Sequence, residues 1–193
     1  MKLRELVDDS KTDKNTTHSY LNLYEELLNK KKKTAINVLE IGIGSFGPKN
    51  GGSIKLWRDY FKNAKIHALD ILPIQFVMDE LINDERVILY TEINAYDKQF
   101  FEKNFLNKNI KCDFLLDDGP HTLESMISFI KLYSQIMTDD GILIIEDVQS
   151  LDWIQILRNK VPDDLKKYVK VYDRRKIKNI RDDIVFTIDK SNY

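Results

Sequence analysis

Four carboxylates stand at the ends of two apolar segments of the chain. The segment CDFLLDDGPH ends in Asp117 and Asp118, and the segment GILIIEDVQS runs into Glu146 and Asp147. Without a cation, four carboxylates at one edge would repel one another. No cysteine or histidine cluster accompanies them, and such an all-oxygen set favours Mg²⁺ over zinc. We therefore expect a divalent metal here, the alternative being that the aspartates only cap the following helix.

A histidine with the position of a general base follows the first carboxylate pair. His121 comes three residues after Asp118, behind a Gly-Pro turn and at the start of a helix-like stretch. A positioned imidazole can take a proton from a reacting hydroxyl, a step typically worth ~10²–10⁴-fold in rate. A lone histidine after such a turn is often structural. Its place beside the carboxylates favours the catalytic interpretation. His67, inside an apolar segment, is expected to be a packed residue.

The elements that must position these residues alternate along the chain. Apolar runs and helix-period stretches follow one another from residue 36 to about 160, which predicts an α/β fold with a parallel sheet and helices on both faces. We expect strands near 36–42, 65–70, 86–91, 112–117, 141–146, 167–173 and 183–189. We expect helices near 53–62, 73–83, 97–107, 121–136 and 150–160. The fold class is therefore a Rossmann-like, seven-stranded, mostly parallel sheet with a C-terminal antiparallel hairpin.

The two acidic strand ends should adjoin. One helix-like stretch separates the two apolar segments, so they should run parallel, and neighbouring strands lie about 4.8 Å apart. Before the sheet, residues 17–30 read as an amphipathic helix. No linker or internal repeat divides the chain. We expect a single domain over 1–193, with a helical segment over 1–33 and a Rossmann-like core over 34–193.

A glycine-rich turn follows the first expected strand. Residues 40–47 read EIGIGSFG, and Gly42, Gly44 and Gly47 fit the pattern GxGxxG, which is weak evidence when it stands alone. A dinucleotide site needs a helix to begin within the glycines, whereas here the residues PKNGG lengthen the loop. Glu40 would also repel phosphate and would suit a cationic amino-acid group. Asp70 ends the next strand, where a carboxylate can bind both ribose hydroxyls or can cap the next helix.

Composition limits the remaining possibilities. The 193 residues include 30 Lys and Arg against 31 Asp and Glu, so a net charge of −1 gives no support to a nucleic-acid partner. Cys112 is the single cysteine, which excludes an internal disulfide. The sequence has neither an apolar stretch of ~18 residues nor a signal-peptide pattern, so we expect no membrane association and a cytoplasmic location. A basic segment, RRKIKNIRDDIVF (174–186), is expected to be a solvated hairpin connection, or alternatively a grip for an anionic substrate.

These motifs together resemble a known family. VLEIGIGSFG, GGSIKLWRDYF, KIHALDI, LLDDGPH and GILIIEDVQ occur in the order seen in class I S-adenosylmethionine-dependent methyltransferases. More narrowly, the chain is similar to the metal-dependent sugar O-methyltransferases of the macrocin and mycinamicin type, including the entry segment TDKNTTHSYLNLYEELL. The resemblance covers roughly residues 12–150. DDGPH combined with IED is its most specific part.

The resemblance implies a role for each residue of the site. It implies that Asp118, Glu146 and Asp147 bind the metal, that His121 is the base, and that Asp117 faces the cofactor amine. Further cofactor-binding residues are implied at the methionine end, the ribose and the adenine: His18, Tyr20, Glu40, Gly42, Gly44, Ser53, Asp70 and Asn94. Two residues depart from the family pattern. Asn94 stands where an acidic residue is usual, and Pro120 stands where Ser is common. The macrolide enzymes are also longer.

The leading functional expectation is a Mg²⁺-dependent and S-adenosylmethionine-dependent O-methyltransferase acting on a sugar hydroxyl. A catechol is the alternative acceptor, because it also presents two neighbouring oxygens. An NAD-dependent oxidoreductase and a non-catalytic subunit that keeps the fold are the competing classes. The expected partner is a small molecule with a hydroxyl acceptor. The resemblance is compatible with a homo-oligomer, although no stripe of the sequence identifies an interface.

Overall fold

A seven-stranded sheet forms the centre of the computed structural model, which describes residues 1–44 and 47–191. Its strand order is β3-β2-β1-β4-β5-β7-β6, with β1 to β5 parallel and β7 antiparallel to both of its neighbours. The strands are β1 (Asn37–Ile41), β2 (Lys65–Leu69), β3 (Val87–Tyr90), β4 (Cys112–Asp117), β5 (Met137–Ile145), β6 (Val169–Asp173) and β7 (Ile184–Asp189). The fold class and all seven expected strands are confirmed.

Helices cover both faces of the sheet, because alternate strand residues are apolar on each side. On one face, Phe114, Leu116 and Ile144 pack with α1 (Tyr20–Leu28), α2 (Gly52–Tyr60) and α3 (Asp79–Ile82). On the other face, Leu115 and Ile145 pack with α4 (Lys98–Phe101), α5 (Leu123–Tyr133) and α6 (Asp152–Lys160). A buried strand with apolar residues on both faces explains the continuous runs in the sequence.

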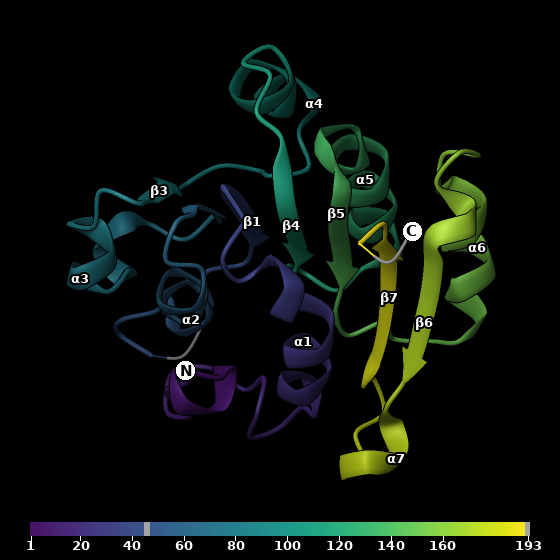
Figure 1. The fold of residues 1–193 in the computed structure, drawn as a ribbon, viewed down its shortest axis with the longest axis horizontal. Helices are drawn as coiled ribbons and strands as arrows, with labels where there is room; N and C mark the ends of the chain where they lie inside the picture. The colour runs from purple at the N-terminus through teal and green to yellow at the C-terminus, as the bar shows by residue number, and fades with distance from the viewer. Residues whose placement is uncertain (45–46, 192–193) are drawn as a thin grey trace.

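The arrangement creates one chemically useful edge. The sheet grows outward from β1 in one direction and from β4 in the other, so the strand order reverses between them. Ligands of open α/β sheets bind beyond the carboxyl ends of the strands at such a reversal. The arrowheads of β4, β5 and β6 point toward the end of the molecule from which α7 (Arg175–Lys178) projects (Figure 1).

Two expected helices differ from the structure. The stretch 73–83 divides into a 3₁₀ turn, Ile74–Phe76, and α3, because Val77 is extended and forms a bridge with Asn50. The Asn50 backbone bonds both Phe76 and Met78, so a tertiary contact overrides the local helical pattern. The stretch 97–107 begins as α4 and continues as a π-helical turn, Glu102–Leu106. Part of the expected hairpin connection forms α7.

The N-terminal segment crosses the same edge of the sheet as the carboxylates. A 3₁₀ turn, Leu3–Glu5, is followed by irregular chain up to α1, and a second 3₁₀ turn, Asn29–Lys31, follows α1. The carbonyl of Lys14 accepts hydrogen bonds from the N–H groups of Tyr20 and Leu21 at the start of α1. Of the helices in residues 1–44 and 47–191, none is both long and apolar enough to cross a bilayer.

Candidate cofactor and metal site

Strand register brings the predicted residues to one place. Asp117 pairs with Ile41 of β1 on one side and with Ile145 of β5 on the other. The residues that follow these three positions are Gly42, Asp118 and Glu146, which therefore leave the sheet side by side. The Asp118 N–H donates to the Ile41 carbonyl and the Glu146 N–H to the Asp117 carbonyl, at 2.9 and 3.1 Å. The prediction that the two acidic tips adjoin is confirmed.

A cavity of about 430 Å³ opens at this edge. Its wall includes seven of the residues singled out from the sequence: Gly42, Gly44, Asp70, Asn94, Asp118, His121 and Asp147. The other predicted residues are buried and are not part of this wall: His18, Tyr20, Glu40, Ser53, Asp117 and Glu146. One cavity thus joins the glycine turn to the carboxylates.

The glycine turn requires glycine for two different reasons. Gly42 and Gly44 have φ of +106° and +110°, a left-handed conformation that only glycine adopts at little cost. A Cβ atom on Gly42 would also lie 2.0 Å from the Asp118 carbonyl oxygen. Of the quoted motif, Ser45 and Phe46 lie outside the described residues. Helix α2 begins only at Gly52, behind the loop, so its N-terminus does not follow the glycines directly as a dinucleotide site requires.

Asp70 fastens the glycine turn from the neighbouring strand. Its Oδ2 accepts a hydrogen bond from the Ile43 N–H at 2.6 Å, and its Oδ1 accepts from the Leu72 N–H at 2.9 Å. Each carboxylate oxygen has a second lone pair, so these bonds leave capacity for two hydroxyl donors. The helical turn that follows, Ile74–Phe76, has Pro73 as its N-cap and no side-chain capping bond, so Asp70 does not make the helix cap that the alternative interpretation expected. The predicted ribose contact is compatible with the two bonds of Asp70 and remains a prediction.

Asp117 is a buried carboxylate with one satisfied oxygen. The Tyr96 hydroxyl donates to Oδ1 at 2.5 Å, whereas Oδ2 is buried without a hydrogen-bond partner among the described residues. Burial raises the pKa of Asp117 to about 7, against the opposing effects of Tyr96 and His121. An unpartnered buried oxygen of this kind suits a cationic or hydrogen-donating ligand group. Asn94 belongs to the same wall, where its Oδ1 accepts from the Tyr96 N–H.

Glu40 is a second buried carboxylate of the same kind. The Trp57 indole donates to its Oε2 at 2.6 Å, Ser53 bonds the same carboxylate, and Oε1 has no hydrogen-bond partner in residues 1–44 and 47–191. Burial raises the pKa of Glu40 to about 8, and the nearby Lys14 ammonium opposes this rise. Ser53 therefore supports Glu40. Its implied role as a cofactor-binding residue remains a prediction.

Asp118, His121 and Asp147 form a compact candidate metal site. One ligand atom from each lies within 4.8 Å of the others. His121 Nε2 is 3.8 Å from Asp118 Oδ1, and His121 Nδ1 is 3.6 Å from Asp147 Oδ2. His121 and Asp147 both have positive φ, 53° and 52°, although neither is glycine. Residues held in this sparsely populated conformation cluster at functional sites.

Glu146 lies behind this group rather than in it. Its side chain is 1% exposed, its Oε1 accepts from the Tyr24 hydroxyl, and its Oε2 accepts from the Lys14 ammonium at 2.5 Å. Burial raises the pKa of Glu146, and so do the adjacent carboxylates, against Lys14. Each Glu146 oxygen keeps a second lone pair beside these contacts, and metal ligation by Glu146 remains a prediction.

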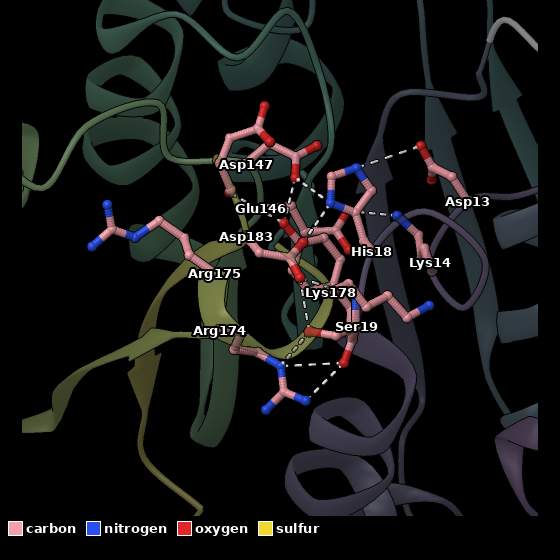
Figure 2. A network of polar contacts seen from close by, with 12 residues as sticks. Asp13, Lys14, His18, Ser19, Glu146, Asp147, Arg174, Arg175, Lys178 and Asp183 are labelled. Carbon is pink, nitrogen blue, oxygen red and sulfur yellow. Dashed lines mark hydrogen bonds and ion pairs between the residues drawn. The ribbon is translucent and has the colours of Figure 1, made fainter. Parts of the chain in front are cut away.

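His18 and Tyr20 contact the metal side of the site. Figure 2 shows His18 between Asp147, Asp183 and Asp13. Its Nδ1 lies 2.6 Å from Asp183 Oδ1 and 3.4 Å from Asp147 Oδ1, while the Tyr20 hydroxyl donates to Asp147. Burial alone would lower the pKa of His18, but the surrounding carboxylates raise it. The implied cofactor-binding role of His18 and Tyr20 remains a prediction.

Sequence reasoning missed residues that hold the site together, among them Lys14, Tyr24 and Tyr96. Tyr24 lies within the amphipathic helix expected over residues 17–30, on its buried face, and its hydroxyl donates to Glu146. No local signal marks Lys14, because a lysine in an irregular segment is normally exposed. In chemical terms, the arrangement offers two acidic oxygens and an imidazole beside a glycine-lined cavity.

Comparison with known proteins places the chain beside sugar O-methyltransferases, although no protein-family model matches it. It is 26% identical over 133 residues to 8-demethyl-8-(2-methoxy-alpha-L-rhamnosyl)-tetracenomycin-C 3'-O-methyltransferase of Streptomyces olivaceus, covering 68% of this chain and 32% of that protein. It is 27% identical over 162 residues to demethylmacrocin O-methyltransferase of Streptomyces fradiae, covering 78% and 37%.

The fold has a solved counterpart. The MycE methyltransferase from the mycinamycin biosynthetic pathway, in complex with Mg, SAH and mycinamycin VI, superposes with a TM-score of 0.77 at 18% identity. The match covers 98% of this chain and 53% of that one. The chain thus spans about a third of the length of the curated relatives and about half of the structural neighbour.

Proposed function

We propose that this chain, which is related to the class I S-adenosylmethionine-dependent methyltransferases of the macrocin and mycinamicin type, is a Mg²⁺-dependent O-methyltransferase for a sugar hydroxyl. The observation that carries the proposal is the single cavity, which reaches from Gly42, Gly44 and Asp70 to Asp118 and His121. A methyl donor and an acceptor must be held together in one cavity for transfer. Such proximity can lower the reaction barrier by up to ~7–11 kcal/mol in ideal cases.

The buried acidic groups fit the proposed cofactor. Within the described residues, Asp117 Oδ2 and Glu40 Oε1 accept no hydrogen bond, and these acidic oxygens suit the amino group of an amino-acid moiety better than a phosphate. Asp70 would accept the ribose hydroxyls while it continues to fasten the glycine turn. The side chain of Asn94, with backbone groups of its segment, would contact the adenine. When bound, S-adenosylmethionine would supply the methyl group.

The carboxylates fit a hard divalent ion. Asp118 and Asp147 would provide oxygen ligands on the cavity wall, with Glu146 as the third predicted ligand. When bound, the ion would lower the pKa of the acceptor hydroxyl and fix its orientation. His121, whose Nδ1 faces Asp147, would take the hydroxyl proton at Nε2. The positive φ of His121 would hold the imidazole toward the acceptor side.

The test combines binding with transfer. Calorimetric titration with S-adenosylhomocysteine and with NADH separates the two cofactor classes, and binding of NADH alone would reject the proposal. Transfer of a labelled methyl group is then measured on a panel of glycosides, nucleotide sugars and catechols, with Mg²⁺ or with EDTA. We expect transfer to sugar hydroxyls that EDTA abolishes. Transfer to catechols alone would reject the sugar acceptor.

A further inference from the structure

A completely buried lysine lies among the carboxylates of the site. The side chain of Lys14 is 1% exposed, and its ammonium donates to Asp118 Oδ2 at 2.7 Å and to Glu146 Oε2 at 2.5 Å. The Oε1 atom of Glu40 lies 3.7 Å away. A buried lysine is rare unless it is paired. Here one cation faces three carboxylates. Glu40 is a predicted cofactor-binding residue, and Asp118 and Glu146 are predicted metal ligands.

The main chain around Lys14 is held by contacts on both sides of this residue. Its carbonyl accepts the N–H groups that open α1, at 3.1 and 3.3 Å. Three residues earlier, the Lys11 carbonyl passes so close to α2 that a Cβ atom on Gly52 would lie 2.2 Å from it. Downstream, Asp183 accepts from the Ser19 hydroxyl, and Arg174 donates to the Ser19 carbonyl (Figure 2). The ammonium is therefore held in place from both directions along the chain.

The two oxygens of Asp118 face different partners. Oδ2 accepts from Lys14, and Oδ1 faces His121 at 3.8 Å. A divalent ion between Asp118 and Asp147 would sit a few ångströms from the ammonium and would share its carboxylates. Lys14 therefore stabilises the carboxylates before an ion arrives and repels the ion when it does.

We infer that Lys14 is a positioning residue that acts as the internal counter-ion of the metal site: it holds Asp118 and Glu146 together in the ion-free protein and sets the metal affinity by competing with the ion for their charge. The inference rests on the proposed function. Lys14 itself would touch neither the cofactor nor the acceptor. Its substitution should therefore separate the stability of the ion-free protein from the affinity for Mg²⁺.

The test compares Lys14→Met with a matched control, Lys31→Met. Lys31 is also buried, at 3% exposure, and pairs with Asp113 and Asp140, which are not part of the site. Loss of the Lys14 cation should lower the melting temperature in EDTA by roughly 10 °C, and loss of the Lys31 cation should also lower it. With Lys14→Met, the dissociation constant for Mg²⁺ should fall by roughly tenfold, as expected for removing one unit charge about 5 Å from a divalent ion even with water-like screening. Lys31→Met should bind Mg²⁺ with wild-type affinity.

Each result bears on one proposal or the other. A wild-type protein that shows no Mg²⁺ binding contradicts the proposed function. Wild type and Lys14→Met with equal affinities, or a weaker Lys14→Met, overturn the inference alone. If Lys14→Met is unfolded in EDTA, the same affinity comparison is made between Glu146→Gln and the double variant Lys14→Met/Glu146→Gln. A double variant that stays unfolded even in saturating Mg²⁺ would assign Lys14 to packing and would also overturn the inference.

Discussion

Replacing Gly42 by alanine is expected to disturb the glycine turn and the acidic tip of β4 in one step. Gly42 has φ of +106°, and an added Cβ would lie 2.0 Å from the Asp118 carbonyl oxygen and 2.8 Å from its carbonyl carbon. The clashing atoms belong to the backbone, so no side-chain rotation relieves the contact. Asp118 would have to move, although its N–H bonds the Ile41 carbonyl at 2.9 Å.

The loss of stability expected for Gly42→Ala has two causes, and a control variant separates them. A left-handed conformation costs a non-glycine residue about 1–2 kcal/mol. Forcing extra volume against fixed neighbours costs about 1–3 kcal/mol more. Gly47 has φ of +98° and no described atom within 4 Å of its added Cβ, so Gly47→Ala carries the first cost alone. We therefore expect the free energy of unfolding of Gly42→Ala to be about 1–3 kcal/mol lower than that of Gly47→Ala.

The assay is urea unfolding followed by circular dichroism, with calorimetric titration of S-adenosylhomocysteine and Mg²⁺. A displaced Asp118 should weaken both ligands in Gly42→Ala. In Gly47→Ala, Mg²⁺ affinity should be unchanged. Equal losses of stability in the two variants, together with an intact Mg²⁺ affinity in Gly42→Ala, would refute the close approach between the glycine turn and β4.

Three further outcomes follow from the contacts described. His121→Gln should lower the rate of methyl transfer by ~10²–10⁴-fold while calorimetry shows unchanged S-adenosylhomocysteine binding; an unchanged rate would remove His121 as the base. Burial lowers the pKa of His67 to about 4 from 6.5, so the unfolded chain binds more protons between these values, and the native state should lose up to ~3 kcal/mol as pH falls through that window. Urea unfolding at several pH values should show this loss in wild type and not in His67→Gln, and parallel profiles would contradict it. Asp183→Asn weakens the bonds to His18 and Ser19 and should cost about 1–3 kcal/mol in thermal unfolding; a wild-type melting temperature would contradict that role.

The strands and the acidic tips could be predicted because their signals are local. An apolar run that ends in carboxylates specifies both the strand and the position of its functional residues, and neighbouring strands bring these ends together. Lys14 could not be predicted in this way. Its burial arises from contacts with Asp118 and Glu146, which are 104 and 132 residues away in the sequence, and no periodicity encodes them.

The prediction of one helix over 73–83 was wrong for a related reason. Its local pattern favours a helix, yet the bridge between Val77 and Asn50 keeps the chain extended at its centre. Tyr96 could not be predicted for the same reason, because its hydroxyl bonds Asp117, which lies 21 residues further along the chain on β4. Residues that complete the site from distant segments carry no pattern of their own in a single sequence.

The bond between His18 and Asp183 closes a loop of 165 residues at the candidate site. Closing a loop of this length costs conformational entropy, and contacts between distant segments are associated with slow folding. During synthesis, residue 183 must leave the ribosome before this bond can form. A shortened fragment that ends before residue 183 would lack it, however well its sheet were assembled. This part of the candidate site thus depends on two segments from opposite halves of the chain.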